Sequence, residues 1–364
     1  NTSSILLCSE SQLPQCPRCR LSCCKYTCKM IKCQNIKHHK IIHVDPKNTN
    51  NYLGWHKVHP KQWFRHPVYD HLKLTIIYSE TGRPIKSVLD KCYDLVEKNS
   101  ICILMCSNIS WIEEIKLPNQ LLILSDKLTY NPRFLPPILH WPRHWVTYGK
   151  HYRPQKNSHA TEFFCPVHRG RPYRLKFLTN MMKKNLLNKK NYTLHIAPND
   201  SAVPIQKDQD IRQNGLLFHL HCHQRYHADL LICLETDPSD ITEKTFQNLS
   251  HTSPIIWPGT HVHDFIKDFG FDLNYEGIDP PTHDFDLDEL IVRPDYKHEF
   301  SDPRYGHLID QYTDILKNIV DQGSSKDLYY SNYKKCLHNQ SVLNDFENMH
   351  RVFAGKILTQ WQKL

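Results

Sequence analysis

Short apolar runs alternate with polar stretches of helical period from about residue 51 onward. The runs at 73–80, 100–108 and 120–126 predict buried strands. One face of the helix predicted between the first two runs carries five apolar residues: Val88, Leu89, Cys92, Leu95 and Val96. Strands that alternate with helices in this way predict a parallel sheet covered by helices on both faces.

A second series of the same kind begins near residue 161. Its predicted strands lie at 161–167, 191–196, 215–223 and 228–235, and its first helix covers 175–187. The stretch after Glu235 predicts, in order, a helix, a strand, a helix closed by Gly270 and a last strand: 242–250, 254–257, 262–269 and 271–274. The C-terminal 40 residues are expected to be helical, most clearly at 308–320.

Together these patterns predict an α/β protein. We expect two Rossmann-like domains with a cleft between them, preceded by a cysteine-rich segment. The expected parts are a cysteine-rich basic segment at 1–50, a first α/β domain at 51–160, a second α/β domain at 161–320 and a helical tail at 321–364.

The bulk composition agrees with two globular domains. The 364 residues are 40% hydrophobic and 23% charged, which allows a large core. No apolar run approaches the roughly 20 residues of a membrane span, so we expect no integral span in this chain. Because the sequence begins at Asn1 rather than at a methionine, a removed N-terminal anchor or signal stays an alternative to a cytoplasmic location.

The first 40 residues are basic and rich in cysteine. They carry seven Lys or Arg against one acid, which indicates either a polyanion partner or a solvated surface. The first seven cysteines are Cys8, Cys16, Cys19, Cys23, Cys24, Cys28 and Cys33. Three interpretations of these cysteines remain: they bind zinc, they form disulfides, or they belong to an accessory or disordered segment. The other seven lie mostly in apolar contexts, which favours free thiols under reducing conditions.

Three arginines crowd the turn between the predicted strand 161–167 and the helix after it. Arg169, Arg171 and Arg174 surround Pro172, a residue suited to the first helical turn. Backbone N–H groups and the positive end of the helix dipole favour an anion there, and guanidinium groups add forked donors. The turn predicts a diphosphate site, with an exposed basic loop as the alternative.

A second candidate site follows the predicted strand 228–235. Glu235 ends this strand, and ligands of parallel sheets bind beyond the carboxyl ends of the strands. Glu235 and Glu243 are therefore expected to accept hydrogen bonds from ribose hydroxyls, with Lys244 beside a phosphate. Asp240 and Glu243 also have the spacing of a capping box, which is the alternative for Glu243.

The segment ICLETDPSDITEKTF, followed by PIIWPG, resembles the donor site of GT-B glycosyltransferases of the α-1,3-fucosyltransferase type. The resemblance covers about residues 161–320 and extends to uncharacterised bacterial and viral relatives. It implies transfer of a sugar from a nucleotide-sugar donor to a hydroxyl of a glycan or glycoconjugate, with neither metal nor cofactor. Glu243 would contact the ribose, while Arg169 or Arg174 and Lys244 would neutralise the diphosphate. Thr236 and Asp240 depart from the family pattern, which leaves the base and the sugar open.

By this resemblance, residues 51–160 form the acceptor domain and residues 161–320 the nucleotide-sugar donor domain. The transfer needs a general base, which we expect from the acceptor domain. Glu80 and Asp126, each at the end of a predicted strand, are the candidates. His219, His221 and His223 alternate along a strand, a pattern that can bind metal but that chance explains in a chain with 25 histidines. The rival functions are a nucleic-acid or polyanion binding protein that uses the basic N-terminus, and a nucleotide-sugar binder that has lost its base.

Overall fold

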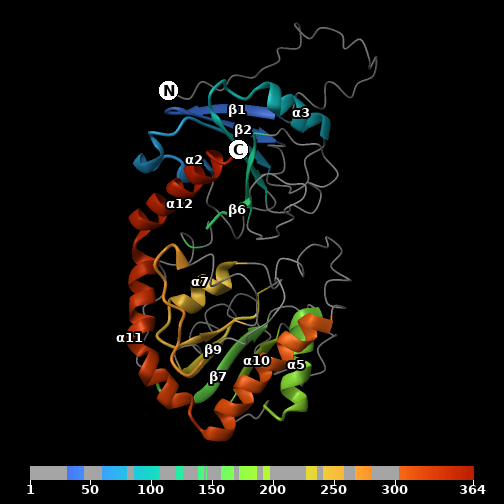
Figure 1. Ribbon diagram of the computed structural model, residues 1–364, viewed down its shortest axis with the longest axis vertical. Coiled ribbons are helices and arrows are strands. Elements are labelled where there is room, and N and C mark those ends of the chain that lie inside the picture. Colours follow the sequence, from blue (N-terminus) through green and yellow to red (C-terminus); the bar gives the residue numbers. More distant parts are fainter. Residues whose placement is uncertain are drawn as a thin grey trace. The chain divides into compact units, whose positions relative to one another are not determined.

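The protein is mixed α/β and divides into two compact units (Figure 1). The first unit comprises Asn1–Arg143 and Glu347–Leu364, and the second comprises His144–Phe346. The computed structural model describes residues 31–44, 60–79, 86–106, 120–125, 138–142, 145, 157–167, 172–186, 192–196, 227–235, 241–257, 267–279 and 303–364.

The first unit contains a six-stranded sheet whose order follows the sequence. Its strands are β1 (Ile31–Ile36), β2 (His39–Val44), β3 (Leu74–Ser79), β4 (Ile101–Cys106), β5 (Leu122–Ser125) and β6 (Ile138–His140). β1 is antiparallel to β2, and every later pairing is parallel. The predicted strands 73–80, 100–108 and 120–126 are confirmed as β3, β4 and β5. β3 and β5 end directly before Glu80 and Asp126 in the sequence, at the carboxyl edge of this sheet.

Residues 31–44 belong to this sheet rather than to a separate N-terminal segment. Ile36, Ile41, Ile42 and Val44 are buried, and Lys37 turns the chain between the two strands with a φ of 50°. Residues 31–44, expected within the cysteine-rich segment, therefore form two strands of the first sheet. Cysteine, histidine and lysine dominate the composition here and hide the apolar positions that form the two strands.

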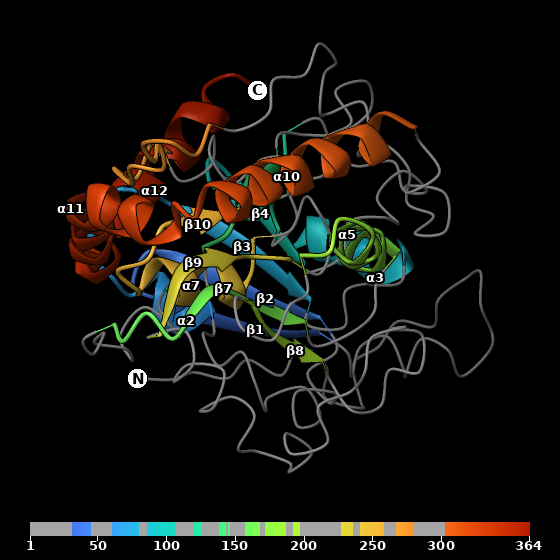
Figure 2. The ribbon, with the colours of Figure 1, turned by 90° about the horizontal axis from the view of Figure 1, so that it is seen from below.

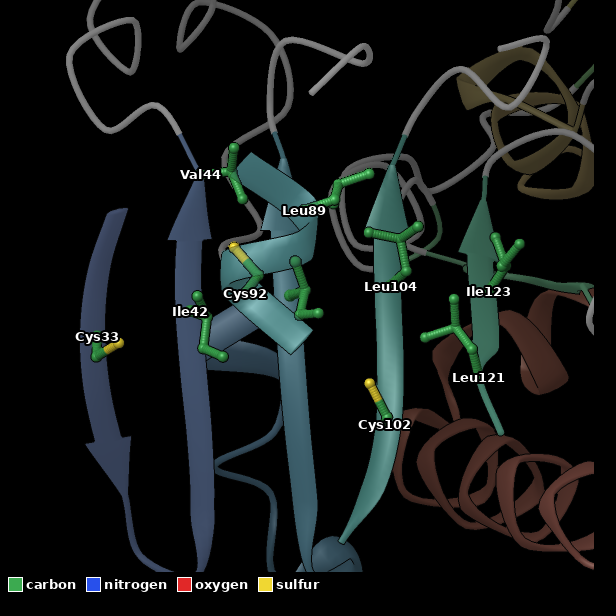
Figure 3. Packing of buried hydrophobic residues seen from close by; sticks show 10 residues of the cluster. Cys33, Ile42, Val44, Leu89, Cys92, Cys102, Leu104, Leu121 and Ile123 are labelled. Carbon is green, nitrogen blue, oxygen red and sulfur yellow. The ribbon is translucent and has the colours of Figure 1, made fainter. Parts of the chain in front are cut away.

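One face of the first sheet packs against helix α3 (Lys86–Asp94), as Figure 3 shows. The buried cluster contains three cysteines, Cys33, Cys92 and Cys102, among aliphatic residues of the strands. Burial raises the pKa of the Cys92 and Cys102 thiols to about 12 and also raises that of Cys33. These three thiols stay neutral, form no disulfide and pack as apolar groups. The other six cysteines of the first 33 residues lie outside the described ranges.

The last helix of the chain, α12 (Phe346–Trp361), packs in the first unit against α2 (Pro60–Trp63) and the short helix η2 (Pro67–Tyr69). Trp63 Nε1 donates to the Tyr69 hydroxyl at 2.9 Å, and this hydroxyl lies 3.0 Å from His350 Nδ1. The His350 ring stacks on His66 with centroids 4.3 Å apart. The Tyr69 oxygen accepts from Trp63, and its own proton is available to His350, whose imidazole is kept neutral by burial.

The second unit contains a four-stranded parallel sheet in the order β10-β9-β7-β8. Its strands are β7 (Thr161–Val167), β8 (Tyr192–Ile196), β9 (Ala228–Ile232) and β10 (Ile255–Ile256). The chain moves from β7 to β8 in one direction and then continues on the other side of β7 with β9 and β10. The strand order therefore reverses between β7 and β9.

Helices follow the strands of this sheet in the predicted places. α5 (Pro172–Lys183) follows β7 and packs against α10 (Pro303–Gln322), beside which it lies in both views (Figures 1 and 2). α7 (Glu243–Leu249) follows β9 and packs against α11 (Ser325–Asn344). Since crossovers between parallel strands are right-handed, the reversal of strand order puts α5 and α7 on opposite faces of the sheet.

The prediction of a strand at 271–274 is wrong, because these residues pair with no other strand. Two buried asparagines of α11 bind the backbone of this segment instead of a neighbouring strand. Asn339 accepts from the Asp272 N–H at 2.8 Å and donates to the Asp272 carbonyl at 2.7 Å. Asn332 does the same for Glu276, at 2.7 and 3.0 Å. Each amide makes the pair of bonds that a neighbouring strand residue would make, and these bonds take the place of strand pairing.

We expect Asn339→Leu to lower the free energy of unfolding by about 2–4 kcal/mol, because it leaves a buried N–H and a buried C=O without partners. Urea unfolding monitored by circular dichroism measures the change. Asn344→Leu, in the exposed last turn of the same helix, is the control and should change stability by less than about 0.5 kcal/mol. Equal effects of the two substitutions would contradict the role assigned to Asn339.

Acid should destabilise the first unit through His350 and His39. Burial lowers the pKa of both imidazoles to about 4, from an ordinary value of 6.5. The unfolded chain therefore takes up these protons first, so the stabilisation is complete above pH 6.5 and is lost as the pH falls toward 4. Each group contributes a slope of at most about 1.4 kcal/mol per pH unit.

Urea unfolding at pH 7, 6 and 5 tests this expectation with His350→Gln, whose side-chain oxygen can still accept from Tyr69. This variant should lose less stability on acidification than the wild type. The exposed His307→Gln should follow the wild type. The same pH slope in all three proteins would show that His350 does not carry the effect.

Candidate functional site

The carboxyl edge of the second sheet, between β7 and β9, is where the strand order reverses. In open parallel sheets, a reversal of strand order is the place where a crevice beyond the carboxyl ends of the strands can receive a ligand. Ligands of open parallel sheets bind at such points. Both stretches that the sequence marks as candidate sites, the one after β7 and the one after β9, begin here.

Arg174 connects the two stretches. It is the third residue of α5, and its side chain is buried, with 2% of its surface exposed. Its Nε donates to the carbonyl oxygen of Glu235 at 2.7 Å. A guanidinium from the helix after β7 therefore holds the backbone directly after β9.

The Glu235 carboxylate caps the start of α7. It is 2% exposed, and Oε1 accepts from the backbone N–H groups of Thr242 and Thr245 at 2.9 and 3.1 Å. Oε1 also accepts from the Thr245 hydroxyl at 2.7 Å, and Oε2 accepts from the Thr242 hydroxyl at 2.5 Å. Thr242 is the N-cap residue of α7 and makes no side-chain cap of its own. One carboxylate thus accepts hydrogen bonds from the backbone N–H groups of the N-cap residue, Thr242, and of the third helical residue, Thr245.

This geometry changes the expected role of Glu235. A carboxylate accepts about four hydrogen bonds, and Glu235 makes four within the protein. Its role here is to position α7, whereas direct ribose contact by Glu235 stays a prediction from the sequence. Sequence reasoning missed Thr242 and Thr245, although their spacing of three is that of an N-cap residue and the third residue of a helix.

Lys244 places a cation at the start of α7. Its Nζ donates to the Thr242 hydroxyl at 3.2 Å and lies 3.7 Å from Glu235 Oε2. Its side chain is 15% exposed. The ammonium therefore compensates the buried carboxylate and keeps some contact with the surface.

The remaining predicted site residues are only partly described. Glu243 is the first residue of α7, and its side chain lies outside the described part. Glu80, Asp126, Arg169 and Arg171 also lie outside it. The structure therefore brings together Arg174, Glu235 and Lys244 and leaves the other five as predictions.

The histidines expected to alternate along a strand, at 219–223, lie outside the described ranges as well. His227 is described, and its Nδ1 lies 2.6 Å from the Ser158 hydroxyl. This residue directly precedes β9, so it lies at the amino edge of the sheet rather than at the crevice. Among the residues described, no three His, Cys, Asp or Glu side chains are grouped as metal ligands.

No family model matches this chain, and no curated protein matches it. Of the helices described above, none combines the length and the apolar character needed to cross a membrane.

We expect Glu235→Gln to lower the free energy of unfolding by about 2–4 kcal/mol. An amide offers one acceptor oxygen in place of two, and its NH₂ group would face N–H and O–H donors. Glu276→Gln, which removes an exposed carboxylate in the same unit, should change stability by less than about 0.5 kcal/mol. Urea unfolding of the three proteins measures both values, and an equal effect of the two substitutions would rule out the capping role.

Proposed function

We propose that the protein is a glycosyltransferase that moves a sugar from a nucleotide-sugar donor to a hydroxyl of a glycan or glycoconjugate. The donor binds at the carboxyl edge of the second sheet, between β7 and β9. One observation carries the proposal: Arg174 and Glu235, from the two stretches that resemble the donor site of GT-B enzymes, are hydrogen-bonded where the strand order reverses.

The finer architecture is part of this proposal. The reversal of strand order in the second sheet supports a Rossmann-like donor domain of the GT-B type. The first sheet, whose described strands follow the sequence order, would form the acceptor domain, and the two domains would enclose the cleft. The return of α12 to the first unit means that this unit is built from two separate parts of the chain, whereas the second unit is continuous.

The charges of the site suit a diphosphate. Departure of the nucleoside diphosphate develops negative charge, which fixed cations stabilise without a metal ion. Arg174 and Lys244 supply two such cations at the crevice, and Arg169 and Arg171 follow β7 in the sequence. Glu243 would bind the ribose, and Glu235 would keep Lys244 and the first turn of α7 in position.

The transfer itself is a substitution at the anomeric carbon of the sugar. The acceptor oxygen forms the new bond to this carbon, and the bond to the diphosphate oxygen breaks. The proton of the acceptor hydroxyl goes to a general base. Glu80 is our first candidate for this base and Asp126 the second, because each follows the carboxyl end of a strand of the first sheet.

Isothermal titration with GDP-, UDP-, ADP- and CMP-sugars tests donor binding. One nucleotide class should bind the wild type, and Lys244→Met and Arg174→Lys should weaken that binding at least about tenfold, a loss of about 1.4 kcal/mol. Lys176→Met, which removes an exposed cation from the same helix as Arg174, should bind as the wild type does. Heat and urea stability of each variant are measured in parallel, because Arg174 and Lys244 both contact the Glu235 network.

Release of nucleoside diphosphate from the bound donor then tests turnover. Glu80→Gln should bind the donor normally and release product at least about a hundredfold more slowly, as expected for loss of a general base. Binding by the wild type without any turnover would indicate a nucleotide-sugar binder rather than an enzyme. No binding of any nucleotide sugar, together with salt-sensitive binding of RNA or DNA, would favour the nucleic-acid alternative.

A further inference from the structure

A pocket of about 440 Å³ lies at the amino edge of the first sheet. Its walls come from the turn that leads from β1 into β2, from residues 70–73 directly before β3, and from Glu97 before β4. In Figure 3, β2 and β4 run in the same direction and β1 runs in the opposite one, so these three segments meet at one end of the sheet. This end is opposite to the carboxyl edge at which β3 and β5 end.

Two ion pairs line the pocket, and in each pair the lysine neutralises the charge of the carboxylate. Lys37 Nζ donates to both carboxylate oxygens of Asp70 at 2.8 and 2.7 Å, and Lys73 Nζ lies 3.4 Å from Glu97 Oε2. The four side chains are 35–48% exposed, so their remaining donor and acceptor positions are accessible. The pocket thus offers hydrogen-bond donors and acceptors side by side with no net charge from these groups.

A buried histidine adds a third polar group. His39 lines the pocket, is 2% exposed and packs edge-on against Phe64, with ring centroids 6.4 Å apart. Neither ring nitrogen has a hydrogen-bond partner among the described residues. Burial lowers its pKa to about 4, so at neutral pH the ring has one donor and one acceptor. Both nitrogens are covered by neighbouring groups, so the ring forms part of the pocket wall, and its resonances are sensitive to a ligand bound there.

The charge balance selects the kind of ligand. An ion of either sign meets as much repulsion as attraction from the two pairs, and a zwitterion would have to separate ammonium groups from carboxylates that are already in contact. A hydroxyl group avoids both problems, because it accepts from a lysine and donates to a carboxylate at the same time. Several hydroxyls on a compact ring repeat this match.

We propose that the pocket at the amino edge of the first sheet binds a neutral carbohydrate, of one or two sugar rings by its volume. Asp70 and Glu97 accept from its hydroxyls, and Lys37 and Lys73 donate to them. The site is separate from the donor site proposed above and does not depend on it.

Saturation-transfer NMR on the full chain tests this proposal. The probes are glucose, galactose, mannose and N-acetylglucosamine at about 10 mM, since single-pocket affinities for sugars near 1 mM are sufficient for detection. GDP and UDP are present to occupy the proposed donor site. At least one sugar should receive saturation, and the ring resonances of His39 should shift when that sugar is added.

The double variant Asp70→Asn/Glu97→Gln keeps the shape of the pocket and removes both carboxylates. It should reduce the sugar affinity at least about fivefold, the loss expected for one hydrogen bond to a charged acceptor. Asp90→Asn/Glu347→Gln, which removes two exposed carboxylates elsewhere in the same unit, should leave the affinity unchanged.

Three outcomes would overturn the proposal: no saturation of any sugar by the folded protein, equal saturation in both double variants, or His39 shifts caused by inorganic phosphate or glycine but not by sugars. If the carbohydrate proposal fails, the titration of the wild type with nucleotide sugars can still succeed. If no nucleotide sugar binds, the NMR signals of the free sugars can still show saturation. The two results are therefore distinguishable.

Discussion

The carboxylate of Glu235 accepts four hydrogen bonds from Thr242 and Thr245, and its backbone carbonyl accepts one from Arg174. A single residue therefore joins β9, the start of α7 and the start of α5. Because these elements lie on the two sides of the reversal in strand order, the geometry of the crevice depends on this residue. Burial makes each bond stronger than it would be in water and makes the loss of any partner more costly.

This network also explains how two cations stay at the same edge. Arg174 is held through the backbone of Glu235, and Lys244 is held through its carboxylate and through Thr242. Cations fixed before a ligand arrives need little reorganisation when charge develops on a leaving group. In the proposed transfer, the buried acid would thereby keep both cations in position.

Periodicity predicts much of the fold. The apolar runs of β3, β4 and β5 and the helical stripe of α3 are in the expected places because both faces of the first sheet are buried, which gives nearly continuous apolar strands. β7, α5, β9 and α7 are also where the sequence indicates them. Within the candidate site, the sequence singles out Arg174, Glu235 and Lys244. It does not reveal that the Glu235 carboxylate binds the start of α7.

The misplaced elements have physical reasons. The segment at 271–274 has the alternation of a strand, but side chains of α11, more than 50 residues later, satisfy its backbone, and no local pattern reveals that contact. In β1 and β2 the apolar residues are interspersed with lysine, histidine and cysteine, so composition suggests a separate segment. The partner of a carboxylate at a strand end also depends on tertiary structure, and Thr242 and Thr245 become its donors only once α7 has packed beside β9.

The most direct test of the account is hydrogen–deuterium exchange of the full chain with and without a nucleoside diphosphate, using GDP and UDP in turn. The account predicts slower exchange in peptides covering 172–183 and 233–249, since these contain the two stretches that meet at the crevice. Binding that protects only peptides of the first unit, or a saturating nucleotide that protects neither stretch, would contradict a donor site between β7 and β9.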